Sequence, residues 1–489
     1  MLRKIKLLSV LGIIFAFAQS LYANEALNGL EHAFEKIKSH NPQKVTEDEI
    51  QGVFNPTIFI PERKNVKLPF EMSAIPIPEF KNETYDIRNY GAQSGGDFLN
   101  TEAIAKAIAD CTKNGGGTVV VPPGRWLTGP ITLKSYVNLH VSEGAEVSFS
   151  EDRSLYRNEV LVRYQGVELY NYTPFIYAYN CENIAITGEG VLQGNGKNWW
   201  PYDKKREVHW KEMIAAAILE QCPVSERKAL SHGTFNPSFI HPVHCKNVLI
   251  EGVTVKDGAF WTVHPVYCEN LTIRKIEVFN NGGHGDGINP DSCKNVLIER
   301  CYVNTRNDCI TIKSGLNEDG WRVGKPCENI VIRYVYAERG YGGVVLGSEI
   351  SGDVRNLFVH DCILNNTDRG IRIKTRTGRG GELENLYFDS IFMPKIKRQP
   401  ILINMRYASA STNMPEGYTN TALTAFHDFY FSNIYCHKSK DSIVIQGKEK
   451  QKVKNIFFEE ITMNSVNGKR AEFAENIQYK NVEINLLEK

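Results

Sequence analysis

One phrase recurs along most of the chain: an asparagine, then alternating apolar residues, then a short polar turn. Asn247-Val248-Leu249-Ile250 is a clear example. The asparagines that open the phrase are Asn183, Asn247, Asn270, Asn295, Asn329, Asn356, Asn385, Asn455 and Asn481. From Asn247 to Asn385 they stand 23 to 34 residues apart. A period of this size indicates a solenoid, in which each repeat packs mainly against its neighbours.

The apolar runs inside each repeat identify the kind of solenoid. They are short, rich in β-branched residues and closely spaced, so a repeat has no room for a helix. Leucine does not recur at the fixed offsets of a leucine-rich horseshoe. The pattern therefore predicts an all-β fold, a parallel β-helix with two to four short strands in each coil. We expect the recurring asparagines to stack at a turn, each amide bonding to the backbone of the next coil.

Other elements are predicted before the first repeat and in two insertions. The pattern predicts a short strand over 85–92 and a helix over Thr101–Lys113, capped by Asn100. The helix would bury one face, made of Ile104, Ala107, Ile108 and Cys111. Further strands are expected at Thr118–Val121 and within 131–141. Long insertions over 199–235 and 398–427 interrupt the regular spacing, and we expect them to shape a binding face.

The first 23 residues are typical of a signal peptide. A basic start with Arg3 and Lys4 precedes an apolar run over 7–18. That run is shorter than the ~20 residues needed to span a bilayer, so we expect cleavage and no membrane insertion. No cysteine lies near the cleavage site, which argues against a lipid anchor. We therefore expect a secreted or periplasmic protein, with 24–80 as a proline-rich extended segment and 81–489 as one β-helix domain.

Composition narrows the class of partner. The formal net charge is +1, so there is no electrostatic case for nucleic-acid binding. The chain has 11 cysteines, an odd number, which argues against a full disulfide framework. Five of them occupy one place in the repeated phrase (Cys181, Cys245, Cys268, Cys293 and Cys327), as small buried packing residues would. No spacing resembles a zinc site, and we expect neither metal nor cofactor.

Three aspartates carry the candidate chemistry. Asp286 and Asp308 are 22 residues apart, about one coil, so stacking would place them a few ångströms apart, near the ~4.8 Å strand spacing. Two carboxylates this close split their pKa values, so that one keeps its proton near neutral pH. Hydrolysis of a glycosidic bond needs such an acid and base. Asp291, in the same stretch, is either a third candidate or a turn residue bonding to nearby backbone.

A basic strand follows later in the chain. Arg372, Lys374 and Arg376 alternate with other residues, so they would point to one face, where an anion would relieve their repulsion. A sugar carboxylate, held bidentately by an arginine, is a natural partner. Lys313, Tyr341 and Tyr407 are further candidates for substrate binding, the tyrosines by stacking on a sugar ring or donating a hydroxyl.

Four motifs stand in a familiar order on this β pattern. They are Gly285-Asp286-Gly287-Ile288-Asn289-Pro290-Asp291-Ser292, Asn307-Asp308-Cys309-Ile310, Gly342-Gly343-Val344-Val345-Leu346-Gly347-Ser348-Glu349 and Arg369-Gly370-Ile371-Arg372-Ile373-Lys374. From about 85 to about 481 the chain resembles the polygalacturonase-like pectin hydrolases, glycoside hydrolase family 28, and especially their exo-acting bacterial branch. The resemblance implies a right-handed parallel β-helix and hydrolysis of α-linked galacturonic acid with inversion.

Two positions depart from the pattern that the resemblance implies. Asp286 and Asp308 match family aspartates, and Arg372 with Lys374 matches the basic motif. Asn307, however, stands where the usual general acid is expected, and Tyr341 stands where a histidine is expected. An asparagine cannot donate a proton as an acid, although it can hydrogen-bond a glycosidic or hydroxyl oxygen. The acid of this chain would then be Asp286 or Asp291.

The substrate implied is an acidic plant cell-wall polysaccharide: pectin, galacturonan or rhamnogalacturonan oligomers, bound by a monomer. Two other functions stay open from the sequence. One is a β-helix polysaccharide lyase, which would need a calcium-binding acidic cluster and a basic proton abstractor. The other is a non-catalytic carbohydrate-binding β-helix, which Asn307 makes plausible. The choice between endo and exo attack also stays open.

Overall fold

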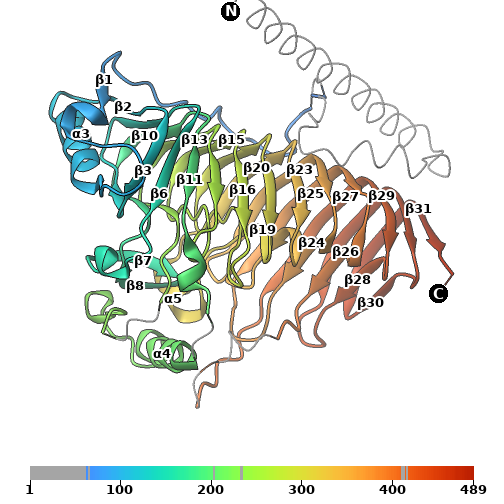
Figure 1. The fold of residues 1–489 in the computed structure, drawn as a ribbon. Coiled ribbons are helices and arrows are strands. Elements are labelled where there is room, and N and C mark those ends of the chain that lie inside the picture. Colours follow the sequence, from blue (N-terminus) through green and yellow to red (C-terminus); the bar gives the residue numbers. More distant parts are fainter. Residues whose placement is uncertain are drawn as a thin grey trace, which may run out of the picture.

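The computed structural model describes residues 62–63, 66–201, 204–231, 235–408, 414 and 417–488. Its body is a parallel β-helix whose coils stack along one axis, from the blue end of the chain in Figure 1 to the red end. The predicted fold class is confirmed. The expected signal peptide, and the expected extended segment up to residue 61, lie outside the described residues. Residues 66–80 have no helix or strand, and within them Phe70 packs against Tyr387 on the outside of the coils.

A coil consists of three strands. One example is β17 (Lys294–Glu299), β18 (Tyr302–Thr305) and β19 (Asp308–Ile312). The first two belong to a large sheet that forms two walls, and β19 begins a six-stranded sheet that continues through β22, β24, β26, β28 and β30. Toward the C-terminus the first two strands of a coil merge into one, as in β23 (Val354–Leu364), which pairs with both strands of the preceding coil.

Apart from the hairpin of β7 and β8, which is inserted between coils, the other strands follow the same order along the axis. Their bounds are β1 Thr84–Asp86, β2 Gly117–Val121, β3 Gly124–Thr128, β4 Ile131–Thr132, β5 Val137–Val141, β6 Ala145–Phe149, β7 Glu159–Tyr164, β8 Val167–Tyr172, β9 Ile176–Tyr179, β10 Glu182–Thr187, β11 Val191–Gln193, β12 Ile240–Val243, β13 Lys246–Glu251, β14 Thr254–Lys256, β15 Glu269–Arg274, β16 Glu277–Asn280, β20 Cys327–Arg333, β21 Tyr336–Arg339, β22 Gly342–Leu346, β24 Thr367–Lys374, β25 Glu382–Met393, β26 Ile396–Asn404, β27 Ala425–Ser439, β28 Ile443–Gln446, β29 Val453–Ser465, β30 Arg470–Glu472 and β31 Ala474–Leu486.

The recurring asparagines form a ladder along one edge. From Asn183 to Asn385, each Nδ2 donates to the Oδ1 of the asparagine one coil earlier, at 2.9 to 3.4 Å. Each of these residues has a φ between 51° and 58°, a left-handed conformation that asparagine tolerates better than most residues. The predicted stack is confirmed. The predicted partner is wrong, because the amide binds a neighbouring side chain rather than the backbone of the next coil.

Helix α3 (Thr101–Lys113) covers the N-terminal end of the stack with the buried face that the sequence predicts (Figure 1). Asn100 occupies the predicted N-cap position, and its carbonyl accepts from the Ile104 N–H (3.0 Å), but its side chain makes no capping hydrogen bond. The Asn100 side chain instead accepts from the Gln93 N–H (2.7 Å) and donates to the Leu127 carbonyl (3.1 Å). The strand expected over 85–92 is also shorter. It ends at Asp86, whose carboxylate accepts from the Arg88 N–H and begins a 3₁₀ turn.

Segments inserted between coils pack together beside the six-stranded sheet (Figure 1). They are the antiparallel hairpin β7–β8 and two helices that the sequence did not predict, α4 (Lys204–Ile214) and α5 (Asn317–Val323). Aromatic residues form their shared core, in which the Tyr164 ring stacks 4.9 Å from Phe235 and 4.7 Å from Phe260. This packing fixes the hairpin against the coils that carry the candidate aspartates.

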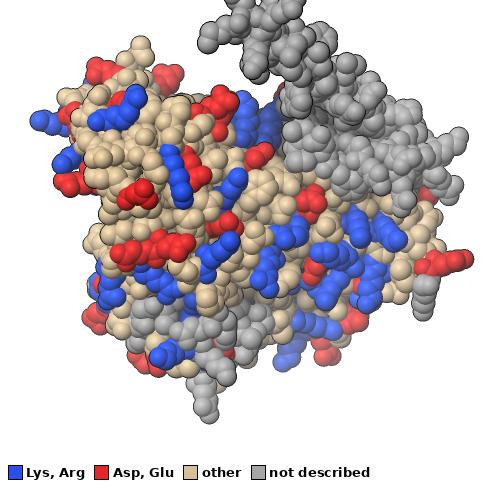
Figure 2. All heavy atoms as spheres, in the orientation of Figure 1, with Lys and Arg blue, Asp and Glu red and all other residues tan. Residues whose placement is uncertain are grey.

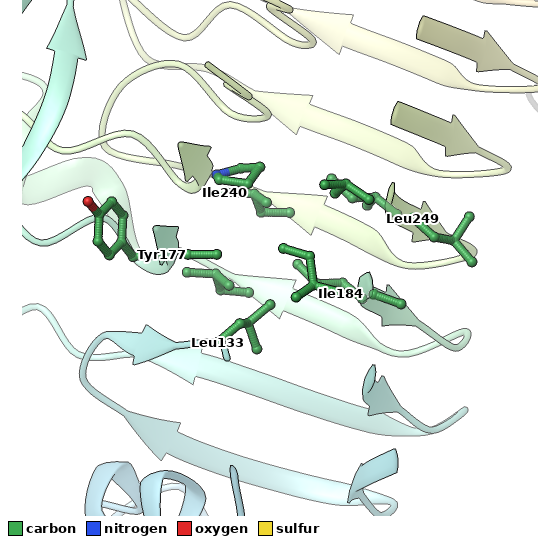
Figure 3. A pocket seen from close by; sticks show the side chains of 12 residues that line it. Leu133, Tyr177, Ile184, Ile240 and Leu249 are labelled. Carbon is green, nitrogen blue, oxygen red and sulfur yellow. The ribbon is translucent and has the colours of Figure 1, made fainter. Parts of the chain in front are cut away.

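Apolar side chains fill the interior of the coils. Leu133, Ile184 and Ile240 point into the space between the walls (Figure 3). All 11 cysteines are free thiols, and all except Cys222 are buried, as the sequence predicts for packing residues. Within the described part of the chain, no helix is both long enough and apolar enough to cross a membrane.

Candidate active site

A cleft lies over the six-stranded sheet, where β19, β22, β24 and β26 meet the inserted segments. The residues that line it are Gln165, Gly283, His284, Asp286, Asn307, Asp308, Lys313, Tyr341, Ser348, Glu349, Asp368, Arg369, Arg372, Lys374, Arg398, Tyr407 and Ala408. The structure therefore brings together eight of the ten candidate residues, Asp291 and Arg376 being the two outside. Five cations and four carboxylates share the lining, so the cleft is densely charged but nearly balanced.

Asp286 and Asp308 lie on adjacent coils, as their spacing predicts. The Gly287 N–H donates to the Asp308 carbonyl (3.0 Å), and the Asp308 N–H faces the Asp286 Oδ1 (3.3 Å). Both side chains are almost buried, with 2% and 3% exposed. Stacked coils thus hold the two carboxyl groups side by side at the floor of the cleft.

The two carboxyl groups have opposite surroundings. Burial raises the pKa of Asp286 to about 7, since its cation, the Lys313 Nζ, stays 4.0 Å away and the charge of Asp308 adds to the effect. Burial would raise the pKa of Asp308 too, but the Lys374 Nζ at 2.7 Å and the Arg372 guanidinium at 3.7 Å lower it below its usual value. Near neutral pH Asp286 can therefore hold a proton that Asp308 lacks.

Lys374 and Arg372 reach Asp308 from two coils away. Both are on β24, and the strand between, β22, places Gly342 directly opposite Asp308. A Cβ on Gly342 would lie 3.4 Å from the Asp308 Oδ1 and 3.7 Å from the Arg372 Cβ. The missing side chain leaves a gap through which the two cations meet the carboxylate. Tyr407 covers them, its ring 5.3 Å from the Arg372 guanidinium and 5.1 Å from the Lys374 Nζ.

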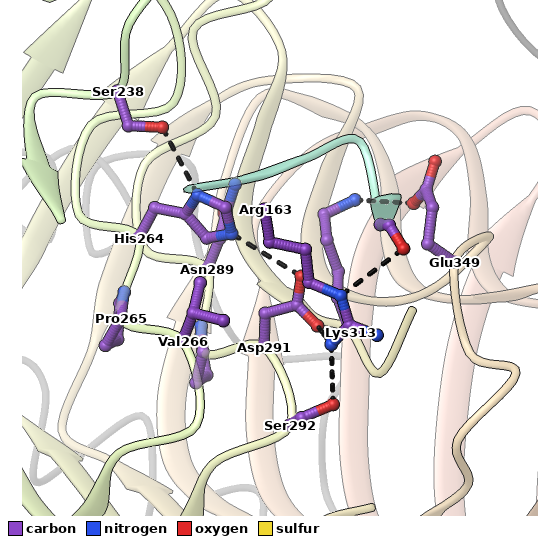
Figure 4. A network of polar contacts seen from close by, with 12 residues as sticks. Arg163, Ser238, His264, Pro265, Val266, Asn289, Asp291, Ser292, Lys313 and Glu349 are labelled. Atoms are coloured by element: carbon purple, nitrogen blue, oxygen red, sulfur yellow. Dashed lines mark hydrogen bonds and ion pairs between the residues drawn. The ribbon is translucent and has the colours of Figure 1, made fainter. Parts of the chain in front are cut away.

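Lys313 and Glu349 form a second buried pair in the cleft wall. The Lys313 Nζ donates to the Glu349 Oε2 at 2.8 Å (Figure 4). It also lies 4.3 Å from the centre of the Trp261 ring. Although burial opposes it, the charge of Lys313 lowers the pKa of Glu349 to about 2. Since Lys313 is engaged with Glu349, it only partly offsets the burial of Asp286.

Asp291 lies behind the cleft and is fully buried. Its Oδ1 accepts from the Arg163 guanidinium (2.8 Å), and its Oδ2 faces the His264 Nε2 (3.5 Å) (Figure 4). Arg163, also buried, comes from strand β7 and donates to the Ser292 hydroxyl as well (2.7 Å). Asp291 therefore anchors the β7–β8 hairpin to the coils, a position without access to a substrate. This placement argues against Asp291 as the acid.

The other candidates divide by position. Asn307 lines the cleft beside Asp308, and Tyr341 is 47% exposed at its rim. Arg376 lies past the end of β24, which stops at Lys374, and is not part of the cleft lining. The expected row of three cations on one strand therefore contains two. The Thr375 N–H still bonds to the Asn404 carbonyl of β26, and the chain turns after it, with the Arg379 N–H bonding to the Arg376 carbonyl.

Several lining residues were not singled out from the sequence. Glu349 ends the third motif, so its place in the motif was an available signal. Arg369 and Asp368 stand at the start of β24, immediately before the predicted pair. Gln165 lies at the tip of the β7–β8 hairpin with a φ of 46°, and nothing in its local sequence points to a cleft whose next lining residue, Gly283, comes 118 residues later.

No candidate metal centre lies in the cleft among the described residues. In the part of the chain that the structure describes, one group of histidine and carboxylate ligands is close enough to share an ion: Glu382, Glu384 and His427, on β25 and β27. None of these residues lines the cleft. In that group the His427 Nε2 already hydrogen-bonds to Glu382 at 2.7 Å.

Comparison with known proteins assigns the chain to a family. The model of glycosyl hydrolases family 28 matches residues 111–484. A probable polygalacturonase from Vitis vinifera is 31% identical over 320 residues, 63% of this chain and 60% of its own length. An exo-poly-alpha-D-galacturonosidase from Dickeya chrysanthemi is 24% identical over 391 residues, 73% of this chain and 62% of its own. The chain thus matches about three-fifths of the length of these two relatives.

A solved structure gives a wider match. The crystal structure of a hyperthermoactive exopolygalacturonase from Thermotoga maritima superposes with a TM-score of 0.79 and 35% sequence identity, covering 84% of this chain and 94% of that one. The family match spans well over half of the sequence, and it includes all four motifs that line or support the cleft. On these grounds the chain is a member of glycosyl hydrolases family 28.

Proposed function

We propose that the protein hydrolyses α-linked galacturonic acid in pectic polysaccharides or oligosaccharides, with inversion at the anomeric carbon. The observation that carries the proposal is the pair of adjacent buried carboxyl groups in a cleft lined by five cations: Asp308 lies 2.7 Å from the Lys374 Nζ, whereas Asp286 is 4.0 Å from the cation nearest to it. Membership of a family whose matched relatives are named polygalacturonases supports the substrate class.

The surroundings of the two aspartates support distinct roles. Asp286 keeps its proton near neutral pH and is the general acid that protonates the leaving oxygen. Asp308 is held as a carboxylate by Lys374 and Arg372, and it accepts a proton from the attacking water. Asn307, which cannot supply a proton, is placed to donate its amide hydrogen bond to a sugar oxygen.

The cations of the cleft suit an acidic sugar. Arg372 and Lys374 share one carboxylate, Asp308, so a substrate carboxylate beside them would meet an excess of positive charge. A neutral sugar would leave that excess unmatched. The Tyr407 ring, which covers both cations, and the exposed Tyr341 at the rim provide faces on which a sugar ring can stack.

The test is a product assay with purified protein on unesterified homogalacturonan, rhamnogalacturonan fragments and their oligomers. The expected result is release of new reducing ends without an unsaturated sugar, lost in Asp286→Asn and in Asp308→Asn. Appearance of an ultraviolet-absorbing product would identify a lyase instead. Binding of these glycans without turnover on any of them would leave a carbohydrate-binding protein, and the anomer released first, followed by NMR, tests inversion.

A further inference from the structure

Basic residues continue beyond the cleft along one corner of the β-helix. The corner is the turn that leads from the large sheet into the six-stranded sheet, and it recurs in each coil from β19 onward. In the last coils it carries Lys395, Lys397, Arg398, Lys440, Lys469 and Arg470, here called the basic strip. All six are exposed, and Figure 2 shows lysine and arginine side chains gathered over the coils of β24 to β30.

Backbone bonds place these residues in consecutive coils. Arg369, in the cleft, is in register with Gln399, next to Arg398. The Asp441 N–H donates to the Arg398 carbonyl (2.9 Å), and the Asn467 N–H donates to the Lys440 carbonyl (2.8 Å). Arg398 belongs to the basic strip and also lines the cleft. The strip therefore starts at the cleft and reaches the coil of β30. From the coil of β26 to the coil of β30 there are two steps of the ~4.8 Å strand spacing, so the strip is about 10 Å long.

Most of the positive charge of the strip is unmatched. Its two neighbouring carboxylates are already engaged: Asp368 lies 3.7 Å from Arg369 and 3.8 Å from Lys397, and Asp441 lies 3.1 Å from Arg470. Within the described part of the chain, no carboxylate lies within 4 Å of the charged groups of Lys395, Arg398, Lys440 or Lys469.

The basic strip differs from the large sheet, where cations are paired with carboxylates. There, cations pair with carboxylates of neighbouring coils, as Arg274 does with Glu251 (2.9 Å) and as Lys294 and Arg355 do with Glu328 (2.9 and 2.7 Å). The whole chain carries a net charge of only +1. The Lys469 Nζ lies 4.2 Å from the centre of the Tyr479 ring, but Lys395, Arg398 and Lys440 have no carboxylate partner among the described residues. A row of cations that begins at the cleft and largely lacks carboxylate partners is therefore a local departure from how this protein neutralises its surface.

We propose that the basic strip binds the continuation of a linear polyuronate chain whose end occupies the cleft. This inference rests on the proposed function and narrows the substrate to a run of consecutive unesterified galacturonates. Such a chain carries one carboxylate on each sugar, so its charges recur along its length as the cations recur from coil to coil. A chain of alternating acidic and neutral sugars, or a methyl-esterified chain, would leave much of the strip unmatched. The same cations would raise the rate of encounter with a polyanion, an effect that salt weakens.

The test removes three charges from the strip without touching the cleft lining, in the variant Lys395→Ala/Lys397→Ala/Lys440→Ala. The matched control is Lys134→Ala/Lys246→Ala/Lys454→Ala, which removes three exposed lysines close to the edge that bears the asparagine ladder. At low ionic strength we expect kcat/KM on long unesterified polygalacturonate to fall about 10-fold in the strip variant, a loss that shrinks as salt is added. On digalacturonate it should stay within about 2-fold of the parent, and the control should match the parent on both. Equal losses on polymer and dimer, or no loss on either, would overturn the proposal.

A binding measurement tests the basic strip independently of whether the protein hydrolyses the glycan. The Asp308→Asn background, with and without the three strip substitutions, is titrated with polygalacturonate, with its fully methyl-esterified form and with vesicles containing anionic lipid. We expect the strip substitutions to weaken binding of unesterified polygalacturonate alone, even if no glycan is turned over. If the substitutions affect only the anionic vesicles, or leave polygalacturonate binding unchanged, the strip does not hold a polyuronate.

Discussion

Replacing Lys374 with methionine tests how the cleft keeps Asp308 ionised. The Lys374 Nζ lies 2.7 Å from the Asp308 Oδ2, and both side chains are more than 90% buried. Methionine has a similar length and no charge, so it removes the cation without opening a large cavity. With this partner lost, the pKa of Asp308 should rise, because its burial is then opposed mainly by Arg372 at the longer distance of 3.7 Å.

The size of the shift follows from the contact that is lost. A hydrogen bond to a charged group contributes about 1.5–3 kcal/mol. Since one pKa unit corresponds to about 1.4 kcal/mol, the pKa of Asp308 should rise by about 1–2 units. Activity requires Asp308 deprotonated, so it grows as pH rises through that pKa, and this acidic limb should move upward by the same amount. The alkaline limb reports loss of the Asp286 proton, whose pKa is about 7. It should also move upward but by less, because the charge of Lys374 lowers the pKa of Asp286 only as a lesser cause, after burial, Lys313 and Asp308. The pH profile would narrow from its acidic side.

The assay is kcat and kcat/KM from pH 3 to 9 on a short galacturonate oligomer, for the parent, Lys374→Met and the exposed control Lys454→Met. The control should reproduce the parent profile. An acidic limb that does not move in Lys374→Met, together with a higher KM at every pH, would refute the reasoning. Lys374 would then act on the substrate carboxylate alone and not on Asp308.

Four further outcomes are expected. Asp286→Asn should lower kcat about 10²–10⁴-fold and abolish the alkaline limb, and a profile that keeps this limb would exclude Asp286 as the acid. Asn307→Asp adds a third carboxylate to a coupled group and should move both limbs to higher pH without raising the maximum rate; a higher maximum would mark position 307 as a vacant acid site. Arg163→Met leaves the charge of Asp291 buried and should lower the free energy of unfolding, measured in urea, by about 3–5 kcal/mol, whereas a loss below 1 kcal/mol would show that this pair does not anchor the hairpin. Export predicts a mature protein in the periplasm or medium beginning near residue 24, and an intact N-terminus on cytosolic protein would contradict it.

The repeat made much of this protein predictable from sequence. A period of one coil converts a difference in residue number into a contact in space, which is why Asp286 and Asp308 could be paired from their separation of 22 residues. The period also predicted correctly that the asparagines stack. It predicted the wrong hydrogen-bond partner for their amides. The choice between a backbone and a side-chain partner depends on the left-handed φ of each asparagine, and the periodic pattern does not indicate that angle.

Where the repeat is interrupted, prediction from sequence fails for a physical reason. Asp291 occupies the same motif as Asp286, yet its role is decided by Arg163, which arrives on a hairpin 128 residues earlier in the chain. Helix α4 is mostly charged and gives no clear apolar stripe, and it is held by Trp210 and Ile214 within the aromatic core of the insertions. Such contacts depend on how insertions dock, and no sequence period encodes the docking.

The assignment of acid and base follows from the order of the coils. Cations reach the site mainly from the C-terminal side, on β24 and β26, while Asp286 lies on the N-terminal side next to the uncharged tip of the hairpin at Gln165. The carboxyl group closer to the cations loses its proton, and the farther one keeps it. This asymmetry needs the gap at Gly342, because any Cβ there would stand 2.4 Å from the Val345 side chain and close to the contact between Arg372 and Asp308. Gly342 lies one coil beyond the acid–base pair and has no side chain. The positive charge of the later coils can therefore reach Asp308 and determine which aspartate donates the proton.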